Sequence, residues 1–474
     1  MPRPKTIERF RVITAGLYLV LVSSFVLDAN RVEANDPASE QKLDNDFIVH
    51  EWGTFTTFSG SDGVYLDYRP LATDHSDLPS FVLDRLSGGN GNGFPVLFKQ
   101  RVRARVRMET PVTYFYTDKP RKVSVRVDFP KGMLTEYYPP AKKILPPLDR
   151  NAALGKGELI GDSSIDWGQI DLIPTNSVIS ESIPEPLRSR LRENLTNSML
   201  PQDPKIQHYG QARATDSALV HVQQRNEFSA FNNWSLNQPQ DFFEKFLFYR
   251  GVGKFELPVA VEFDQRSATF TNRGQDEIRS VIMLEVRNGK MRMNVVDKVA
   301  AESSQTFGEL SPASEQDLEN TLVQRLAAEG LYDKEARAMV STWKSSWFAE
   351  DGRRVLYMVP GNITDELLPL HVKPTPKESL RVLVARMELL SQEDEQELLT
   401  QIRESLERRN AFIADPGNKG KTFPFPQGIA SYGRMAEPAL ARVATIAKDA
   451  TVRREAKLLL AQIRASVKLT AITP

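Results

Sequence analysis

The chain has 474 residues with 61 basic and 61 acidic side chains, so its formal net charge is zero. This balance gives no bulk attraction to nucleic acid or anionic lipid, and it disfavours a nucleic-acid partner. The chain contains no cysteine, which excludes disulfides, thiolate catalysis and cysteine–zinc sites. Its length is sufficient for about two to four domains, each with its own core.

Residues 1–34 have the layout of a secretory signal peptide. Basic residues precede an apolar run over 12–27, and small or apolar residues follow at positions 32 and 34, which a signal peptidase reads. The run is shorter than the ~20 residues that a membrane-spanning helix needs. We therefore expect cleavage near Ala34 and export to the periplasm or the medium, with no transmembrane segment in the mature chain. An uncleaved membrane anchor is the alternative.

Residues 35–46 are polar and without periodicity, which predicts a flexible linker. The segment 49–58 then has the aromatic and β-branched composition of a strand. It contains His50 and Glu51, and adjacent side chains of a strand point to opposite faces. After turn-forming residues, the segment Tyr65 to Leu71 is expected to pair back as a second strand.

The clearest alternation of polar and apolar residues lies between residues 101 and 129. Arg101, Arg103, Arg105 and Arg107 alternate with apolar residues, and the alternation resumes after a turn at 118–120. This pattern predicts antiparallel strands with one buried face, as in a β-sandwich or an open sheet. We expect the arginine face to be solvated and paired with carboxylates, and binding of an anionic ligand is the alternative.

The region from 139 to 300 mixes turn formers with further strand patterns. Residues 139–204 are expected to pack over the sheet with one helix over 186–197. The aromatic block 241–263 is expected in the core, with its glycines at 251–253 in a hairpin turn. Asn288-Gly289 is a strong hairpin-turn signal.

The pattern becomes more helical after residue 311. The segment Ser311 to Ser314 is expected to cap a helix that ends at Gly330, and a second helix, two strands and a charged helix follow up to residue 409. After a linker at 415–427, the final helix pair resembles a single HEAT repeat. One such unit cannot bury its own apolar face, so we expect it to dock on the body.

The predicted fold class is α+β. A β-dominated antiparallel sheet or sandwich body is expected over 47–300, followed by a mixed α/β segment over 301–414 and a helical, HEAT-like hairpin over 428–470.

Five segments together resemble a family of large secreted bacterial proteins with a Val-His-Glu-Trp-Gly-Thr-Phe-Thr motif. These segments are Val49 to Thr56, Met108 to Pro111, His208-Tyr209 with Ala212-Arg213, Phe246 to Gly251, and Ser346 to Phe348. The resemblance spans most of the mature chain and supports the predicted organisation. It implies no activity and no catalytic residues.

One hypothesis for chemistry is a divalent metal held by His50, His208 and His221 beside Glu51. Imidazoles and a carboxylate can bind zinc and leave one position for an activated water. Because His50 and Glu51 point to opposite faces of a strand, both could serve one site only at a bulge or a strand end. A structural role for His50, with its ring bonded to a backbone carbonyl, is the favoured interpretation.

A metal-free hypothesis uses paired carboxylates next to aromatic residues, as in many glycosidases. Its candidate carboxylates are Glu51, Asp67, Glu109, Glu136 and Asp166. Tyr209 and Arg213 are further catalytic candidates. No Gly-x-Ser-x-Gly motif supports a serine nucleophile.

The non-enzymatic interpretation is an exported binding or structural module with a protein or carbohydrate ligand. It requires no catalytic constellation, and we favour it over a secreted hydrolase.

Overall fold

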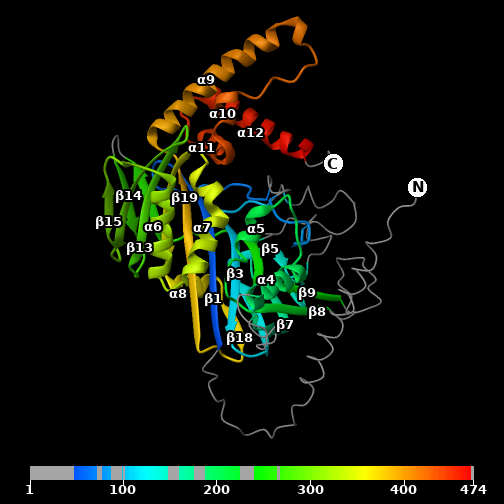
Figure 1. Cartoon of the computed structure of the whole chain (residues 1–474). Coiled ribbons are helices and arrows are strands. Elements are labelled where there is room, and N and C mark those ends of the chain that lie inside the picture. The colour runs from blue at the N-terminus through cyan, green and yellow to red at the C-terminus, as the bar shows by residue number, and fades with distance from the viewer. Residues whose placement is uncertain are drawn as a thin grey trace, which may run out of the picture. The chain divides into compact units, whose positions relative to one another are not determined.

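The structure is a computed structural model, and it describes residues 47–71, 77–86, 99, 102–147, 160–175, 187–224, 240–263 and 267–470. The predicted signal peptide (1–34) and linker (35–46) lie outside the described residues. The described chain is α+β, as predicted, with β-sheets at its centre and helices outside them (Figure 1). None of its helices combines the length and the apolar character needed to cross a membrane.

A ten-stranded sheet forms the centre of the fold. Its strands, in spatial order, are β16 (Ser311–Ala313), β14 (Lys290–Val299), β13 (Ile278–Arg287), β17 (Gly352–Val359), β19 (Glu378–Leu389), β1 (Phe47–Ser59), β3 (Val106–Thr117), β10 (Leu247–Gly253), β5 (Gly132–Tyr138) and β2 (Leu83–Asp84). Strand β1 pairs in parallel with β19 and antiparallel with β3. The predicted first strand is therefore a central one.

Two smaller sheets cover one face of the ten-stranded sheet. One contains β18 (Leu370–Lys373), β4 (Arg121–Phe129), β7 (Ser163–Ile173), β8 (Leu219–Gln224) and β9 (Gln240–Glu244), with β6 (Lys143–Leu145) paired to β7. The other contains β11 (Val259–Phe263), β12 (Ala268–Asn272) and β15 (Ser304–Phe307). A large apolar core joins these sheets to the ten-stranded sheet, which makes the body a sandwich.

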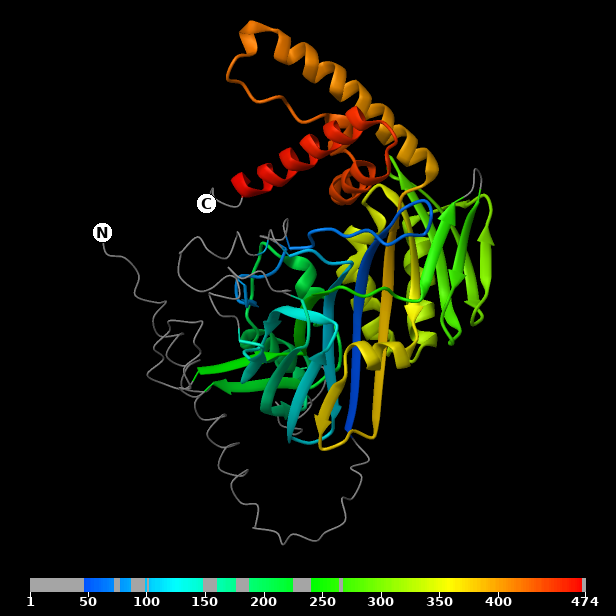
Figure 2. The same ribbon diagram turned by 180° about the vertical axis from the view of Figure 1, so that it is seen from behind.

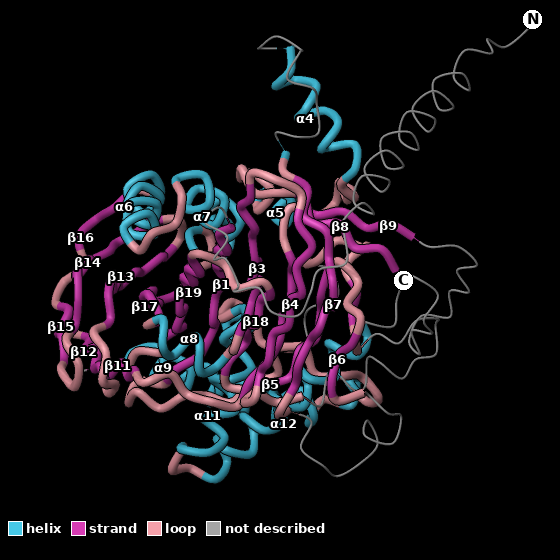
Figure 3. Tube along the Cα trace, turned by 90° about the horizontal axis from the view of Figure 1, so that it is seen from below, coloured by secondary structure: helices cyan, strands magenta, loops and turns pink. Residues whose placement is uncertain are grey.

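The opposite face of the ten-stranded sheet is covered by helices. They are α5 (Gln207–Gln211), α6 (Glu315–Ala328) and α7 (Asp333–Phe348), whose apolar residues pack with Trp52 and Tyr114 in a second core. Figure 3 shows α6 and α7 on one side of β13, β17, β19 and β1, with β11 and β12 on the other. The remaining helices of the body are α4 (Leu187–Met199) and α8 (Gly361–Leu367).

The C-terminal helices form a third core above one end of the sheet (Figure 2). They are α9 (Gln392–Ala414), α10 (Gln427–Ala430), α11 (Ala436–Ile446) and α12 (Ala450–Thr470), with a 3-10 turn, η3 (Gly433–Met435), before α11. Their apolar faces close over Phe58, Leu66 and Tyr68 of the body. The predicted docking of the terminal helix pair on the body is confirmed.

Several local predictions are confirmed because short-range chemistry decides them. Ser314 caps α6 and accepts a hydrogen bond from the Asp317 backbone. Asn288 and Gly289, with φ of 52° and 71°, form the turn between β13 and β14. Alternate residues of β4 are buried, as the period of two predicts.

Other predictions were wrong. The glycines of 251–253 lie within β10 and do not form a turn, and Tyr65 to Leu71 makes only isolated bridges. Residues 163–173, within the segment 139–204 that was expected to pack over the sheet with one helix, form strand β7. The boundary predicted near residue 300 does not separate two bodies, because β17 and β19 lie next to β1.

Candidate functional site

His50 and Glu51 lie on opposite faces of β1, as strand alternation predicts. The His50 Nδ1 atom is 2.8 Å from Glu335 Oε2 on the side of the helices. Tyr116 donates a hydrogen bond to the other oxygen of Glu335 over 2.8 Å. His50 thus ties β1 to α7. The prediction that the His50 ring would bond to a backbone carbonyl was wrong, because its Nδ1 atom bonds to the Glu335 carboxylate.

Glu51 lies inside the sandwich with no exposed surface. Arg381 donates to Glu51 Oε2 from Nε at 2.8 Å and from Nη2 at 2.5 Å, and Tyr249 donates to Oε1 at 2.7 Å. Thr113 also donates to Oε1, at 2.9 Å. Both oxygens are therefore engaged by four donor atoms. This arrangement is a buried structural ion pair, which leaves Glu51 without access to a substrate.

The segment from His208 to Arg213 lies in and after α5. Glu244 accepts hydrogen bonds from Arg213 Nε at 2.9 Å and Nη2 at 2.7 Å, and from the Tyr209 hydroxyl at 3.3 Å. Tyr209 is buried in the core under α5. Tyr209 and Arg213, predicted as catalytic candidates, thus hold a helix against β9.

His221 lies in a different sheet from His50. Its Nε2 atom is 2.9 Å from Asp241 Oδ1, and its ring stacks on Phe243. Burial alone would lower the pKa of His221, but hydrogen bonds to Asp171 and Asp241 outweigh it and raise the pKa. The predicted metal set is not assembled, since His50, Glu51 and His221 hold separate partners. No group of three or more His, Asp or Glu residues that could hold a metal occurs within the described ranges.

A row of ionisable side chains crosses the helix-covered face of the ten-stranded sheet, toward the end that the C-terminal helices cover. We call these eight side chains the charged row: Arg354, Arg386, Glu388, Arg107, Glu109, Arg250, Glu136 and Asp84. They come from β17, β19, β3, β10, β5 and β2, and all except Asp84 are buried. Burial of so many charges is costly unless each is paired.

One half of the charged row lies on β17 and β19. Glu388 lies 3.2 Å from Arg354 Nε and 2.5 Å from Arg386 Nε. Arg386 also reaches Glu350, just after α7, at 2.9 Å, and Glu350 in turn binds Arg434 of η3 at 2.8 Å. This half links the sheet to α7 and to the C-terminal helices.

The other half begins at β1 and β3. Thr56 of β1 donates to Glu109 Oε2 over 2.6 Å, and Arg107 Nε lies 3.3 Å from Glu109 Oε1. Burial alone would raise the pKa of Glu109, but Arg107, Arg434 and Arg250 outweigh it and hold the pKa below its usual value. Glu109 is therefore an ionised carboxylate at neutral pH.

Glu136 has the opposite electrostatic environment. Burial, reinforced by repulsion from Asp84, raises the pKa of Glu136 although Lys99 and Arg250 oppose the shift. Glu136 and Glu109 lie on the same sheet face with β10 between their strands. General acid–base catalysis needs one group that donates a proton and one that accepts it. Two carboxylates with opposite pKa shifts are suited to these two roles.

All five segments of the family resemblance contribute to the charged row, contact it or interact with it electrostatically. Glu109 and Arg250 belong to the row, and Thr56 contacts Glu109. Ser346 accepts a hydrogen bond from Arg386. The charge of Arg250 acts on His208, and together with burial it lowers the histidine pKa. Sequence patterns alone missed this cluster, and the five segments were the signal that could have found it.

A groove lies between the C-terminal helices and the body. Residues 62–69, with Arg103 and Arg105, form one wall, and α11 with Arg464 of α12 forms the other. The volume of this hairpin groove is about 520 Å³. Two ion pairs join its walls, Arg69–Glu437 and Arg442–Asp62, and Arg464–Glu437 links α12 to α11 within the second wall. An added Cβ at Gly60 would meet the Arg442 guanidinium group, so a substitution there would displace this side chain from its ion pair.

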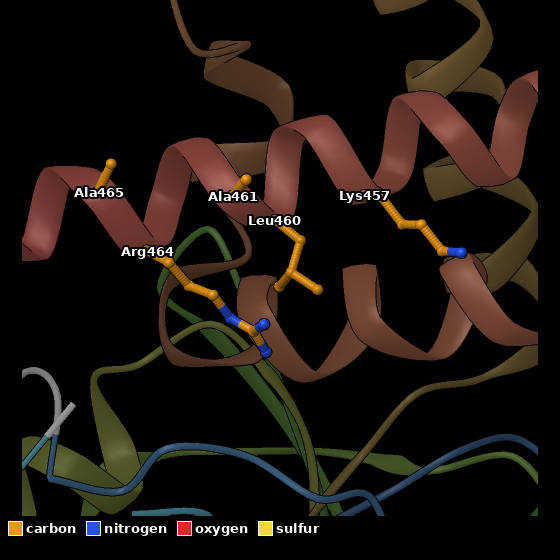
Figure 4. Close-up of a pocket in the computed structure, with 5 residues that line it drawn as sticks. All are labelled: Lys457, Leu460, Ala461, Arg464 and Ala465. Carbon is orange, nitrogen blue, oxygen red and sulfur yellow. The ribbon is translucent and has the colours of Figure 1, made fainter. Parts of the chain in front are cut away.

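Arg464 also borders a second hollow of about 420 Å³ on α12. In Figure 4, Arg464 and Leu460 extend from α12 toward α11, whereas Ala461 and Ala465 lie on the opposite side of the helix. The described residues that line this hollow all belong to α12. The hairpin groove, which has described residues of both the body and the C-terminal helices in its walls, is the better candidate for a ligand.

The other predicted residues are dispersed. Asp67 accepts from Arg105 in the hairpin groove, and Asp166 accepts from the Gly168 backbone in β7. The four alternating arginines at 101–107 lie in different environments. Arg103 is exposed, Arg105 pairs with carboxylates as expected, and Arg107 is buried. Arg101 lies outside the described residues.

No known family model matches the chain, and no curated protein sequence matches it. Among solved structures, it is similar to the yeast delta-COP-I mu-homology domain complexed with a Dsl1 WxWxV peptide, with 7% identity and a TM-score of 0.22. That match covers 73% of this chain and 96% of the other. The same domain without the peptide has 8% identity and a TM-score of 0.21, with 75% and 98% covered. Similarity this low does not bear on function.

Proposed function

We propose that the protein is an exported binding module whose hairpin groove holds a short acidic peptide segment of another protein. The supporting observation is the composition of the groove. Val64 and Ile446 are 53% and 47% exposed, and both line it beside exposed Arg103. Peptide-binding sites combine apolar contact surface with a few charged groups that fix orientation.

Arg103 supplies the charge complementarity. The other arginines of the groove already have carboxylate partners, such as Asp67 for Arg105 and Glu437 for Arg69 and Arg464. Arg103 has no ion pair within the described part of the chain. A carboxylate of the peptide would pair with it while an aliphatic or aromatic side chain covers Val64 and Ile446.

Selection of random seven-residue peptides displayed on phage against the mature protein tests the proposal. We expect enrichment of peptides that combine Asp or Glu with a large apolar residue. Arg103→Glu should weaken binding of a selected, fluorescently labelled peptide at least tenfold in fluorescence polarisation, because it replaces attraction by repulsion. The matched control is Arg279→Glu, an exposed arginine on β13. Undiminished binding by Arg103→Glu would exclude the groove.

A carboxylate-based glycan hydrolase is the second candidate, and the opposite pKa shifts of Glu109 and Glu136 favour it. Neighbouring strands lie about 4.8 Å apart, so side chains two strands apart approach the separation of about 6.5–9.5 Å found in inverting glycosidases. If a panel of polysaccharides reveals activity, Glu136→Gln should lower it at least tenfold, while exposed Glu262→Gln leaves it unchanged. Equal activity in both variants would remove this candidate.

A further inference from the structure

Asp77 occupies an unusual position beside the charged row. Its Oδ2 atom lies 2.7 Å from Arg250 Nη1 and 3.4 Å from Arg107 Nη2. The side chains of these arginines are only 3% and 11% exposed, whereas that of Asp77 is 37% exposed. The carboxylate is therefore the outermost member of the cluster, and two buried guanidinium groups lie beneath it.

Arg250 depends on this one carboxylate. Asp77 is its ion-pair partner within the described ranges, and its buried Nε atom has no hydrogen-bond partner. Arg107, in contrast, also contacts Glu109 and the Pro70 carbonyl. If Asp77 moved away, Arg250 would lose its direct ion pair and keep only the longer-range attraction of Glu109 and Glu136, and an anion from solution would then replace the lost contact.

His208 is a further ionisable group that interacts with Arg250 and Asp77. Burial and the charge of Arg250 lower its pKa, so the ring is neutral at pH 7, and Asp77 opposes this shift. Burial alone would raise the pKa of Asp77, but Arg250, Arg107 and His208 hold it well below its usual range. A site that keeps a carboxylate ionised this strongly is also suited to other oxyanions.

We propose that Arg250, Arg107 and His208 form an oxyanion-binding site for a carboxylate or phosphate group, and that the carboxylate of Asp77 fills it in the free protein. An anionic ligand binds by displacing Asp77. The ligand group must be planar or tetrahedral with at least two oxygens, because the guanidinium groups approach from two neighbouring strands, β3 and β10. This site is separate from the hairpin groove and does not depend on the function proposed for it.

Asp77→Ser tests the site with inorganic phosphate as the probe, at constant ionic strength in chloride. We expect phosphate to bind this variant at least tenfold more tightly than the wild type in isothermal titration calorimetry, because the competing carboxylate is gone. Arg250→Gln in the Asp77→Ser background should abolish the gain. Acetate in place of phosphate shows which of the two oxyanions the site prefers.

Two further variants make each outcome decisive. Asp77→Asn keeps the shape of the side chain and serves if Asp77→Ser does not fold. Asp67→Ser removes an aspartate that pairs with half-buried Arg105, so it controls for the loss of any surface carboxylate. Equal phosphate affinity in the wild type and both Asp77 variants would overturn the proposal. So would a gain in Asp67→Ser, or a gain that persists without Arg250 and disappears with Arg103→Glu.

Discussion

Glu51→Ala is expected to lower the free energy of unfolding by about 3–5 kcal/mol, the range found when one partner of a buried ion pair is removed. The substitution leaves Arg381, whose side chain is 5% exposed, without its bidentate partner. It also removes the acceptor of Tyr249 and Thr113. Urea denaturation followed by circular dichroism measures the change.

Asp365→Ala is the matched control for Glu51→Ala. Asp365 pairs with the same guanidinium group at 3.0 Å, but its side chain is 70% exposed. Exposed ion pairs contribute about 0–1 kcal/mol, so this variant should remain close to wild type. Similar destabilisation in the two variants would show that Arg381 is satisfied by solvent and that the Glu51 pair is not structurally dominant.

Lys245→Met is expected to change how stability depends on pH. Lys245 is 5% exposed, and its Nζ atom donates to the Ser217 carbonyl at 2.5 Å. Burial lowers the pKa of Lys245 to about 8, although Asp216 and Glu244 oppose the shift. The unfolded chain has the ordinary lysine pKa of about 10.4, so above pH 8 the unfolded state holds a proton that the folded state has released.

The free energy of unfolding of the wild type should therefore rise with pH above 8, because of this residue, by about 2 kcal/mol up to pH 9.5. Below pH 8 both states are protonated and the penalty for a buried ammonium is fully present. Lys245→Met removes this penalty, so its stability advantage should be largest at pH 7 and shrink toward pH 9.5. Exposed Lys298→Met should follow the wild-type profile. A difference between Lys245→Met and wild type that does not vary with pH would contradict the assignment.

The local parts of this structure were accessible from sequence. Alternation predicted that His50 and Glu51 face different ways, and the Asn288-Gly289 pair predicted its turn. These features depend on backbone geometry over a few residues. The glycines of β10 were predicted to form a hairpin turn, but in the structure they let neighbouring strands pack closely. A Cβ on Gly251 would lie 2.7 Å from the Met133 carbonyl oxygen of the neighbouring strand.

The charged row was not accessible from sequence in the same way. Glu109 and Glu136 were among the candidate carboxylates, but their pKa values depend on burial and on Arg250 and Asp84, which lie on other strands. No short-range pattern brings these strands together, since their order in the sheet depends on long connections. The residue types were visible, and their mutual placement required the three-dimensional structure.

The pairing of β1 with β19 also constrains the order of folding. Ile48 is the register partner of Glu378, so the central ladder joins the start of the described chain to a segment far along the sequence. Contacts of such high sequence separation slow folding, because a long loop must close before the strands can pair. A ribosome that has not yet synthesised residues 378–389 holds a chain in which β1 lacks its parallel neighbour. The body therefore completes its central sheet only after translation has passed these residues, and until that point the chain retains an unpaired strand edge.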